Sequence, residues 1–347
     1  MIEPGQRLPN FARRDQSGAL VMAYEFSCGA LIVIVLAETP MSDAATALIK
    51  SLEPLHLDGF AGPKVAVMVP GSQDEAQSAA ETLGGSLSVW ADEDGRVMDF
   101  LLGGRIPKAV AAFAFDANFR LIGRFDADGG DDLAAAVTHA WADVNSDQLA
   151  TIVTAGAPVL IVPRVLEPED CAAVIELYQA GQPTESGMTR LVDGKPTLVP
   201  DPSAKIRQDV EITDEQRTNA LMTRIGKRLA PEIQKAFHYT IEQFERFKIV
   251  AYDADTGGYF RPHRDNTAPQ ARLRRFAMTI NLNTGDYEGG CLRFPEYGPA
   301  LYEPPRGGAI VFSCDHAHEL TDVSLGRRYA LLTFFSQKPP ETRPEDG

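Results

Sequence analysis

Hydrophobic and polar positions alternate along the first 150 residues in a pattern that predicts strands and helices in turn. Residues 31–37 and 64–70 are continuous runs of aliphatic residues, LIVIVLA and KVAVMVP, which predict strands buried on both faces. Helix formers follow each run: residues 42–52 begin at Ser42, a favourable N-cap, and residues 72–85 end in two glycines. This stretch therefore predicts a β-α-β-α order.

The segment that follows completes an α/β pattern. Residues 87–91 predict a third short strand, residues 106–125 predict two strands joined by a turn at 116–118, and residues 131–144 predict a closing helix. A β-α-β-α-β unit followed by a hairpin and a helix is typical of an α/β sandwich.

That order resembles the thioredoxin-like fold, and the opening PGQRLPNFARRDQSGALV is similar to the start of redoxin and peroxiredoxin proteins. The resemblance implies a cis-proline ahead of the hairpin, and Pro107 falls at that place. It also implies a peroxidatic cysteine after the first buried strand, but residues 38–47 contain none, and Cys28 precedes the strand. We expect residues 1–150 to form a thioredoxin-like domain without a catalytic thiol.

A second domain is expected from residue 151 to about 340. Two helices are predicted at its start, one with Pro168 in its first turn and one at the capping-box sequence TDEQ of residues 213–216. The second helix has a predicted core stripe, which consists of Leu221, Ile225, Leu229, Ile233 and Phe237. Residues 182–206, between the helices, are rich in turn formers and predict either a mobile functional loop or disorder.

Short strands separated by glycine and proline follow Phe244. They are predicted at residues 245–252, 275–283, 289–297, 308–313 and 327–335. Together with the two helices, this pattern indicates an all-β sandwich or jelly roll with a helical buttress.

Composition and charge narrow the possible functions. The chain has 347 residues and 44% hydrophobic content, no apolar run approaches the roughly 20 residues of a membrane span, and the start lacks a leader pattern. We therefore expect a cytoplasmic protein without a membrane partner. The net charge of −15 disfavours nucleic acid, and the basic residues Arg272, Arg274 and Arg275 are expected to be solvated or ligand-facing.

The chemistry of the second domain is indicated by RPHRDN, in which His263 and Asp265 lie two residues apart. Such a pair is by itself common in surface turns. Downstream, CDHAHELTDV offers His316 or His318 as a third ligand, and two histidines with one carboxylate are the ligand set of non-haem Fe(II) oxygenases. The two histidines would share one face of a strand, so their positions alone do not separate them.

An arginine distinguishes between the two histidines. Arg328 lies ten residues beyond His318, in a strand that could pair beside it, and a planar guanidinium is suited to binding a dicarboxylate. The alternative is that these residues form ordinary surface contacts, with Arg328 paired to Glu319 or Asp322.

At this point the second half resembles the Fe(II)/2-oxoglutarate dioxygenases of the prolyl 4-hydroxylase type, whose fold is a double-stranded β-helix, or jelly roll. The matching segments include KIVAYDADTGGYFRPHRDN and HELTDVSLGRRYALLTFF. The family implies His263, Asp265 and His318 as catalytic iron ligands. It implies Arg328 and Tyr252 as partners of 2-oxoglutarate and Tyr259 as a residue facing substrate or cosubstrate, with Arg327 and His316 as alternatives.

The resemblance implies Fe(II), 2-oxoglutarate and O2 as cofactors, with ascorbate as a possible reductant. The expected activity is hydroxylation of a C–H bond in a protein or peptide side chain, with release of succinate and CO2. The alternatives are a small-molecule substrate, a non-catalytic metal or oxygen sensor, and a thiol redox protein acting through the first domain. That first domain is also a possible homodimer contact.

Overall fold

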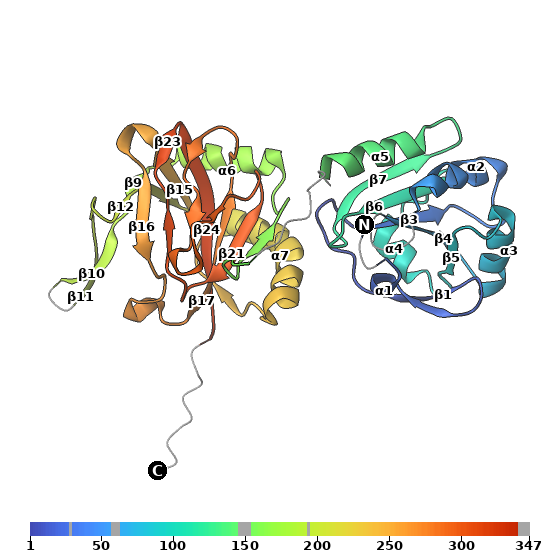
Figure 1. Ribbon diagram of the computed structural model, residues 1–347, viewed down its shortest axis with the longest axis horizontal. Helices are drawn as coiled ribbons and strands as arrows, with labels where there is room; N and C mark the ends of the chain where they lie inside the picture. Colours follow the sequence, from blue (N-terminus) through green and yellow to red (C-terminus); the bar gives the residue numbers. More distant parts are fainter. Residues whose placement is uncertain (28–29, 57–62, 145–153, 193–194, 339–347) are drawn as a thin grey trace, which may run out of the picture. The chain divides into compact units, whose positions relative to one another are not determined.

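The computed structural model describes residues 1–27, 30–56, 63–144, 154–192 and 195–338 (Figure 1). The chain divides into two compact units, Met1–Ala150 and Thr151–Gly347, which we call the N-terminal and C-terminal units. No helix within the described residues is both long and apolar enough to cross a membrane.

The N-terminal unit is built on a seven-stranded sheet with strand order β2-β1-β5-β4-β3-β6-β7. Strand β3 pairs in parallel with β4, and β4 with β5, whereas the β1, β2, β6 and β7 pairings are antiparallel. The strands are β1 (Ala12–Asp15), β2 (Leu20–Met22), β3 (Leu31–Leu36), β4 (Lys64–Val69), β5 (Ser88–Ala91), β6 (Val110–Phe115) and β7 (Leu121–Ala127). The helices are α1 (Ala23–Ser27), α2 (Asp43–Leu52), α3 (Gln73–Leu83), α4 (Arg96–Leu102) and α5 (Leu133–Val144).

Strand β3 shows why the central strands are continuous runs of apolar residues in the sequence. Its alternate residues Ile32 and Ile34 join a core cluster with α2, α3 and α5, while Val33 and Val35 join a second cluster with α4. Both faces of the sheet are therefore covered, which confirms the predicted α/β sandwich. The β1–β2 hairpin, α1 and α4 were not predicted.

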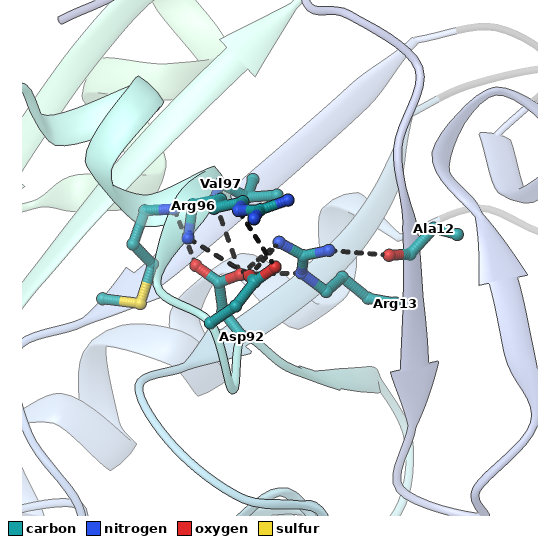
Figure 2. A network of polar contacts seen from close by, with 7 residues as sticks. Ala12, Arg13, Asp92, Arg96 and Val97 are labelled. Carbon is teal, nitrogen blue, oxygen red and sulfur yellow. Dashed lines mark hydrogen bonds and ion pairs between the residues drawn. The ribbon is translucent and has the colours of Figure 1, made fainter.

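A network of polar contacts ties strand β1 to the start of α4 (Figure 2). Asp92, 2% exposed, accepts hydrogen bonds from Arg13 Nε at 2.7 Å and from the Met98 amide at 2.8 Å. Arg13 Nη2 also reaches Asp94 at 2.7 Å. The buried carboxylate is thus neutralised by a guanidinium and caps a short helix that has no side-chain cap at Gly95.

The thioredoxin-like expectation named two residues, Pro107 and Cys28. The cis peptide bond within the described residues is Thr39–Pro40, so the expectation of a cis bond at Pro107 is wrong. Cys28, the residue weighed for a redox role, lies outside the described residues.

The C-terminal unit consists of antiparallel sheets arranged as a jelly-roll-type sandwich. The larger sheet has the order β8-β21-β17-β24-β15-β13-β9, with β14 also paired to β24, and the second sheet has the order β12-β16-β22-β19-β20. The larger sheet contains β8 (Leu160–Val162), β9 (Thr184–Glu185), β13 (Gln208–Glu211), β14 (Gln243–Phe244), β15 (Lys248–Asp253), β17 (Arg274–Asn281), β21 (Ala309–Ser313) and β24 (Arg327–Ser336). The second contains β12 (Lys205–Ile206), β16 (Tyr259–His263), β19 (Leu292–Arg293), β20 (Leu301–Tyr302) and β22 (His318–Leu320).

Helices α6 (Pro168–Ala180) and α7 (Glu215–Phe237) pack against the larger sheet in one core cluster. The predicted stripe of α7 lies in that cluster, with Ile225, Leu229 and Ile233 buried. The helix begins one residue later than the TDEQ spacing predicted, because the Asp214 side chain accepts from the Arg217 amide and acts as N-cap.

The described residues of the 182–206 segment form short strands, where the turn-rich composition suggested a loop. They contain β9, the hairpin of β10 (Met188–Val192) and β11 (Lys195–Val199), and β12. Strand β9 pairs with β13, and β12 pairs with β16. One end of this segment therefore pairs with the larger sheet through β9, and the other end pairs with the second sheet through β12. A further short ladder joins β18 (Glu288–Gly289) to β23 (Val323–Leu325).

Candidate metal centre

Two histidines and one aspartate meet where β16 ends and β22 begins. His263 is the last residue of β16, His318 is the first of β22, and the two are paired across the antiparallel ladder. Asp265 follows in the loop, with its carboxylate oxygens 3.5 Å from His263 Nε2 and 3.3 Å from His318 Nε2. Among the described residues, these three form a group of side chains that could hold a metal ion, with ligand atoms all within 4.8 Å of one another.

Backbone carbonyls orient both imidazoles. His263 Nδ1 lies 2.8 Å from the Arg261 carbonyl oxygen, and His318 Nδ1 lies 3.0 Å from that of His316. Each Nδ1–H donates to its carbonyl, which leaves each Nε2 directed toward the aspartate. Burial lowers the pKa of His318 to about 4, which keeps this imidazole neutral near pH 7.

The charge state of the aspartate suits a cation. Burial by itself would raise the pKa of Asp265, but His318 and His263 hold the pKa of this carboxyl below its ordinary value. Two imidazole nitrogens and one carboxylate therefore face a common point. This donor set fits Fe(II) and leaves coordination positions for other ligands.

The neighbouring histidine is separated from this group. His316 lies in the turn before β22, so the expectation that it shares a strand face with His318 is wrong. Its Nδ1 lies 3.2 Å from the Tyr297 hydroxyl. Only His318 of the pair lines the cavity described next.

The three residues open into a cavity of about 390 Å³, which Arg328 and Tyr252 also line. Arg328 on β24 pairs across the ladder with Tyr252 on β15, is 3% exposed, and donates from Nη2 to Asn281 Oδ1 at 2.6 Å. Its Nε is buried without a hydrogen-bond partner. A buried donor of this kind fits a carboxylate ligand.

Gly290 provides room for this arginine. It has a φ of +62°, and a Cβ at this position would lie 2.9 Å from Arg328 Cδ and 2.9 Å from Val323 Cγ2. A larger residue would therefore push the guanidinium out of place.

The remaining predicted residues lie elsewhere. The Tyr259 hydroxyl donates to the Pro202 carbonyl at 2.5 Å, and Tyr259 is not part of the cavity lining, so the expectation that it faces cosubstrate is not met here. Arg327 is exposed and forms an ion pair with Asp253. Of the three arginines at 272–275, Arg274 lines the cavity and donates to the Asp265 carbonyl at 3.0 Å.

Lys205, Arg207 and Asp209 are charged residues of the cavity wall that sequence reasoning did not single out. Arg207 forms a bidentate pair with Asp209 at 2.6 and 2.7 Å and donates from Nη1 to the Tyr252 hydroxyl at 3.3 Å. The signal for these residues in the sequence was the alternation of charged side chains along KIRQD. An exposed strand at the edge of a sheet has the same pattern, so the signal did not indicate a cavity.

Comparisons with known proteins point to the same region. Residues 247–336 match the family model described as the 2OG-Fe(II) oxygenase superfamily. Procollagen-lysine,2-oxoglutarate 5-dioxygenase 1 of Mus musculus is 31% identical over 112 residues, which cover 30% of this chain and 14% of the relative. Human multifunctional procollagen lysine hydroxylase and glycosyltransferase LH3 is 27% identical over 125 residues, covering 35% and 16%. The chain thus spans about a seventh of these relatives' length.

Solved structures with a related arrangement include a Pseudomonas putida prolyl-4-hydroxylase, 19% identical with a TM-score of 0.39, covering 54% of this chain and 95% of that one. A Trichoplax adhaerens prolyl hydroxylase is 18% identical with a TM-score of 0.41, covering 52% and 83%. The family match lies within the C-terminal unit.

Proposed function

We propose that the C-terminal unit is an Fe(II)- and 2-oxoglutarate-dependent dioxygenase that hydroxylates a C–H bond of a protein or peptide side chain. The observation that carries the proposal is that the His263–Asp265–His318 group and the buried Arg328 line one cavity. In this proposal the three residues hold the iron. Arg328 binds the distal carboxylate of 2-oxoglutarate, because its Nε has no other partner.

When bound, Fe(II) and 2-oxoglutarate supply the activation of O2, and the products are succinate, CO2 and the hydroxylated substrate. The contribution of the protein is orientation. The Tyr252 hydroxyl accepts from Arg207, so its own hydrogen is available to donate to the cosubstrate carboxylate. Phe260, Leu292 and Phe312 line the cavity and reduce the access of water.

A peptide substrate is supported by the curated relatives, whose names describe the oxidation of lysine in procollagen. The segment with the β10–β11 hairpin also favours a peptide. Its ends at 184–187 and Lys205 form part of the cavity wall, where an extended chain could lie. A small-molecule substrate is the alternative outcome of the experiments below.

The N-terminal unit is proposed to be a thioredoxin-like fold without its catalytic thiol. Its parallel β3–β4–β5 core followed by the β6–β7 hairpin supports this assignment. The place after β3, where the peroxidatic cysteine would stand, holds Thr39 and Pro40. We propose that this unit serves as a contact for a partner or a second copy, which sedimentation of the isolated full chain would test.

The first test is the anaerobic addition of Fe(II) and then 2-oxoglutarate, followed by oxygen with ascorbate as reductant. We expect a weak visible charge-transfer band and then succinate formation, both of which are lost in His318→Ala because two ligands rarely hold Fe(II). His316→Ala is the matched control and should retain both. Folded wild-type protein that gives neither band nor succinate would contradict the proposal and favour a non-catalytic role.

The second test separates two adjacent arginines. Arg328→Met should raise the apparent KM for 2-oxoglutarate by about 10- to 100-fold, since a hydrogen bond to a charged group contributes about 1.5–3 kcal/mol. Arg327→Met, which removes an exposed arginine paired with Asp253, should leave that KM unchanged. Equal effects of the two substitutions would show that Arg328 does not bind the cosubstrate.

A further inference from the structure

The cavity wall carries more positive charges than the proposed cosubstrate requires. Three of these cations are neutralised by a neighbouring carboxylate, in the ion pairs Arg207–Asp209, Arg264–Glu296 and Arg274–Glu245. Lys248 is half-buried and lies opposite Glu211 in the β13–β15 ladder, where Glu211 pairs with Arg246. Within the described residues, Arg328 and Lys205 are the buried cavity cations that form no ion pair with a carboxylate.

Lys205 is held firmly in the wall. It is 7% exposed and lies on β12, at the edge of the second sheet, opposite Phe260 of β16. Its Nζ donates to the Gly187 carbonyl at 2.8 Å and lies 4.8 Å from the centre of the Phe260 ring. The Phe260 ring in turn stacks on His263, with centroids 3.4 Å apart and an interplanar angle of 16°. The ammonium group is therefore one aromatic ring away from the proposed metal ligands.

This arrangement is unfavourable for the protein alone. An ammonium group has three N–H donors, and one is used by Gly187. Burial, with a contribution from the nearby Arg207, lowers the pKa of Lys205 to about 7. A methionine of similar length would fill the same space without a buried charge, so the lysine at this place indicates that the cavity receives an anion.

We propose that Lys205 binds a carboxylate of the substrate, so that the enzyme selects substrates that carry an acidic group close to the oxidised carbon. The proposal rests on the proposed function in assigning Arg328 to the cosubstrate. Lys205 is left for a second anion, on the side of the cavity formed by Gly187 and Phe260. The carboxylate comes either from an acidic residue of a peptide or from a free amino acid.

The test compares acids with their neutral counterparts by titration calorimetry. The probes are N-acetyl dipeptide amides that contain Glu or Gln, or Asp or Asn, and the corresponding free amino acids. They are titrated into full-length protein loaded with Zn(II), which has no redox chemistry, and 2-oxoglutarate. We expect the acidic member of a pair to bind about 10- to 100-fold more tightly than the amide. The peptide and amino-acid arms identify the source of the carboxylate.

The variants assign that preference to one side chain. Lys205→Met should remove the preference for the acid, and Lys205→Arg should retain part of it because the positive charge remains. Lys227→Met, at an exposed position on α7 outside the cavity lining, controls for the loss of one charge and should leave the preference unchanged. Binding of Zn(II) and 2-oxoglutarate should be the same in all four proteins.

Three results would overturn the inference: equal affinity for acids and amides, no binding of any acidic probe to wild-type protein, or a preference that persists in Lys205→Met. The same titrations without Zn(II) and 2-oxoglutarate separate this inference from the dioxygenase proposal. A Lys205-dependent preference in protein that never forms succinate would support the carboxylate site and reject the oxygenase assignment alone.

Discussion

The two units treat buried charge in opposite ways. In the N-terminal unit, Asp92 is saturated by Arg13 and by the amide groups at the start of α4, so its charge connects two elements of the fold (Figure 2). In the C-terminal unit, Asp265 faces two imidazoles across a cavity, and Lys205 has no carboxylate partner among the described residues. A buried charge whose hydrogen-bonding and ionic partners are all supplied by the protein stabilises the structure. A buried charge that lacks such partners is available to bind a ligand.

The difference separates structural from functional residues of the same chemical type. Asp92 and Asp265 are both largely buried aspartates. What distinguishes them is the number of donors already directed at each carboxylate. Three predictions test this distinction, from the largest expected effect to the smallest.

The first prediction concerns the two aspartates. Asp265→Asn should weaken binding of Fe(II) or Zn(II) by at least about 100-fold, because even residues that merely orient ligands are worth 10- to 100-fold. Asp92→Asn should leave metal binding unchanged but lower the free energy of unfolding of the N-terminal unit by about 2–3 kcal/mol, because it removes the buried ionic partner of the Arg13 guanidinium and leaves only the more exposed Asp94.

Metal titration and urea unfolding measure the two effects. Both tryptophans of the chain, Trp90 and Trp141, belong to the N-terminal unit, so tryptophan fluorescence follows the unfolding of that unit selectively. Equal losses of stability in the two variants would contradict the division between saturated and unsaturated charge.

The second prediction concerns Gly290. Gly290→Ala places a Cβ against Arg328 and Val323 at a positive φ, so we expect the affinity for 2-oxoglutarate to fall about 10-fold. Gly257→Ala is the control, because Gly257 has a φ of +70° but nothing within 4 Å of an added Cβ. It carries the same backbone strain and should leave this affinity unchanged; a similar loss in both variants would assign the effect to strain.

The third prediction concerns the stability and pH dependence of Lys205→Met. Removing a buried, unpaired charge should raise the free energy of unfolding of the C-terminal unit by about 1–3 kcal/mol at pH 6. The pKa of Lys205 is lowered to about 7 in the folded protein, compared with 10.5 for an exposed lysine. Between these values the unfolded wild-type chain binds the proton and the folded one does not, so wild-type stability rises with pH and the advantage of methionine shrinks.

Calorimetry at several pH values checks this sign, with the transition of the C-terminal unit identified as the one without a change in tryptophan fluorescence. The charged groups that influence this lysine are Arg207, Asp209, Lys248 and Asp265. The acid-over-amide preference of the wild type should weaken above pH 7 as the ammonium loses its proton. An advantage of methionine that grows with pH would contradict the assignment.

Much of the fold was predictable because its signals are local. The pattern of hydrophobic positions predicted the aliphatic runs of β3 and β4 and the core stripe of α7. This pattern directly reflects which side chains are buried. Helix α4 was missed because it has no side-chain cap of its own and depends on Asp92 from the end of β5. The strand pairings of residues 182–206 were not predicted, because β9 and β12 pair with β13 and β16, which lie later in the sequence.

The sequence by itself determined the types of side chain at the site. These are the His-x-Asp pair, a later histidine and an arginine ten residues beyond it, and they can be recognised in the sequence because each role needs a specific side chain. Only the tertiary structure decided that Tyr259 lies outside the cavity lining and that Lys205 is buried without a carboxylate partner among the described residues. The physical reason is that a side chain's charge is encoded by its residue type, whereas the groups that neutralise it are brought together by strands far apart in the chain.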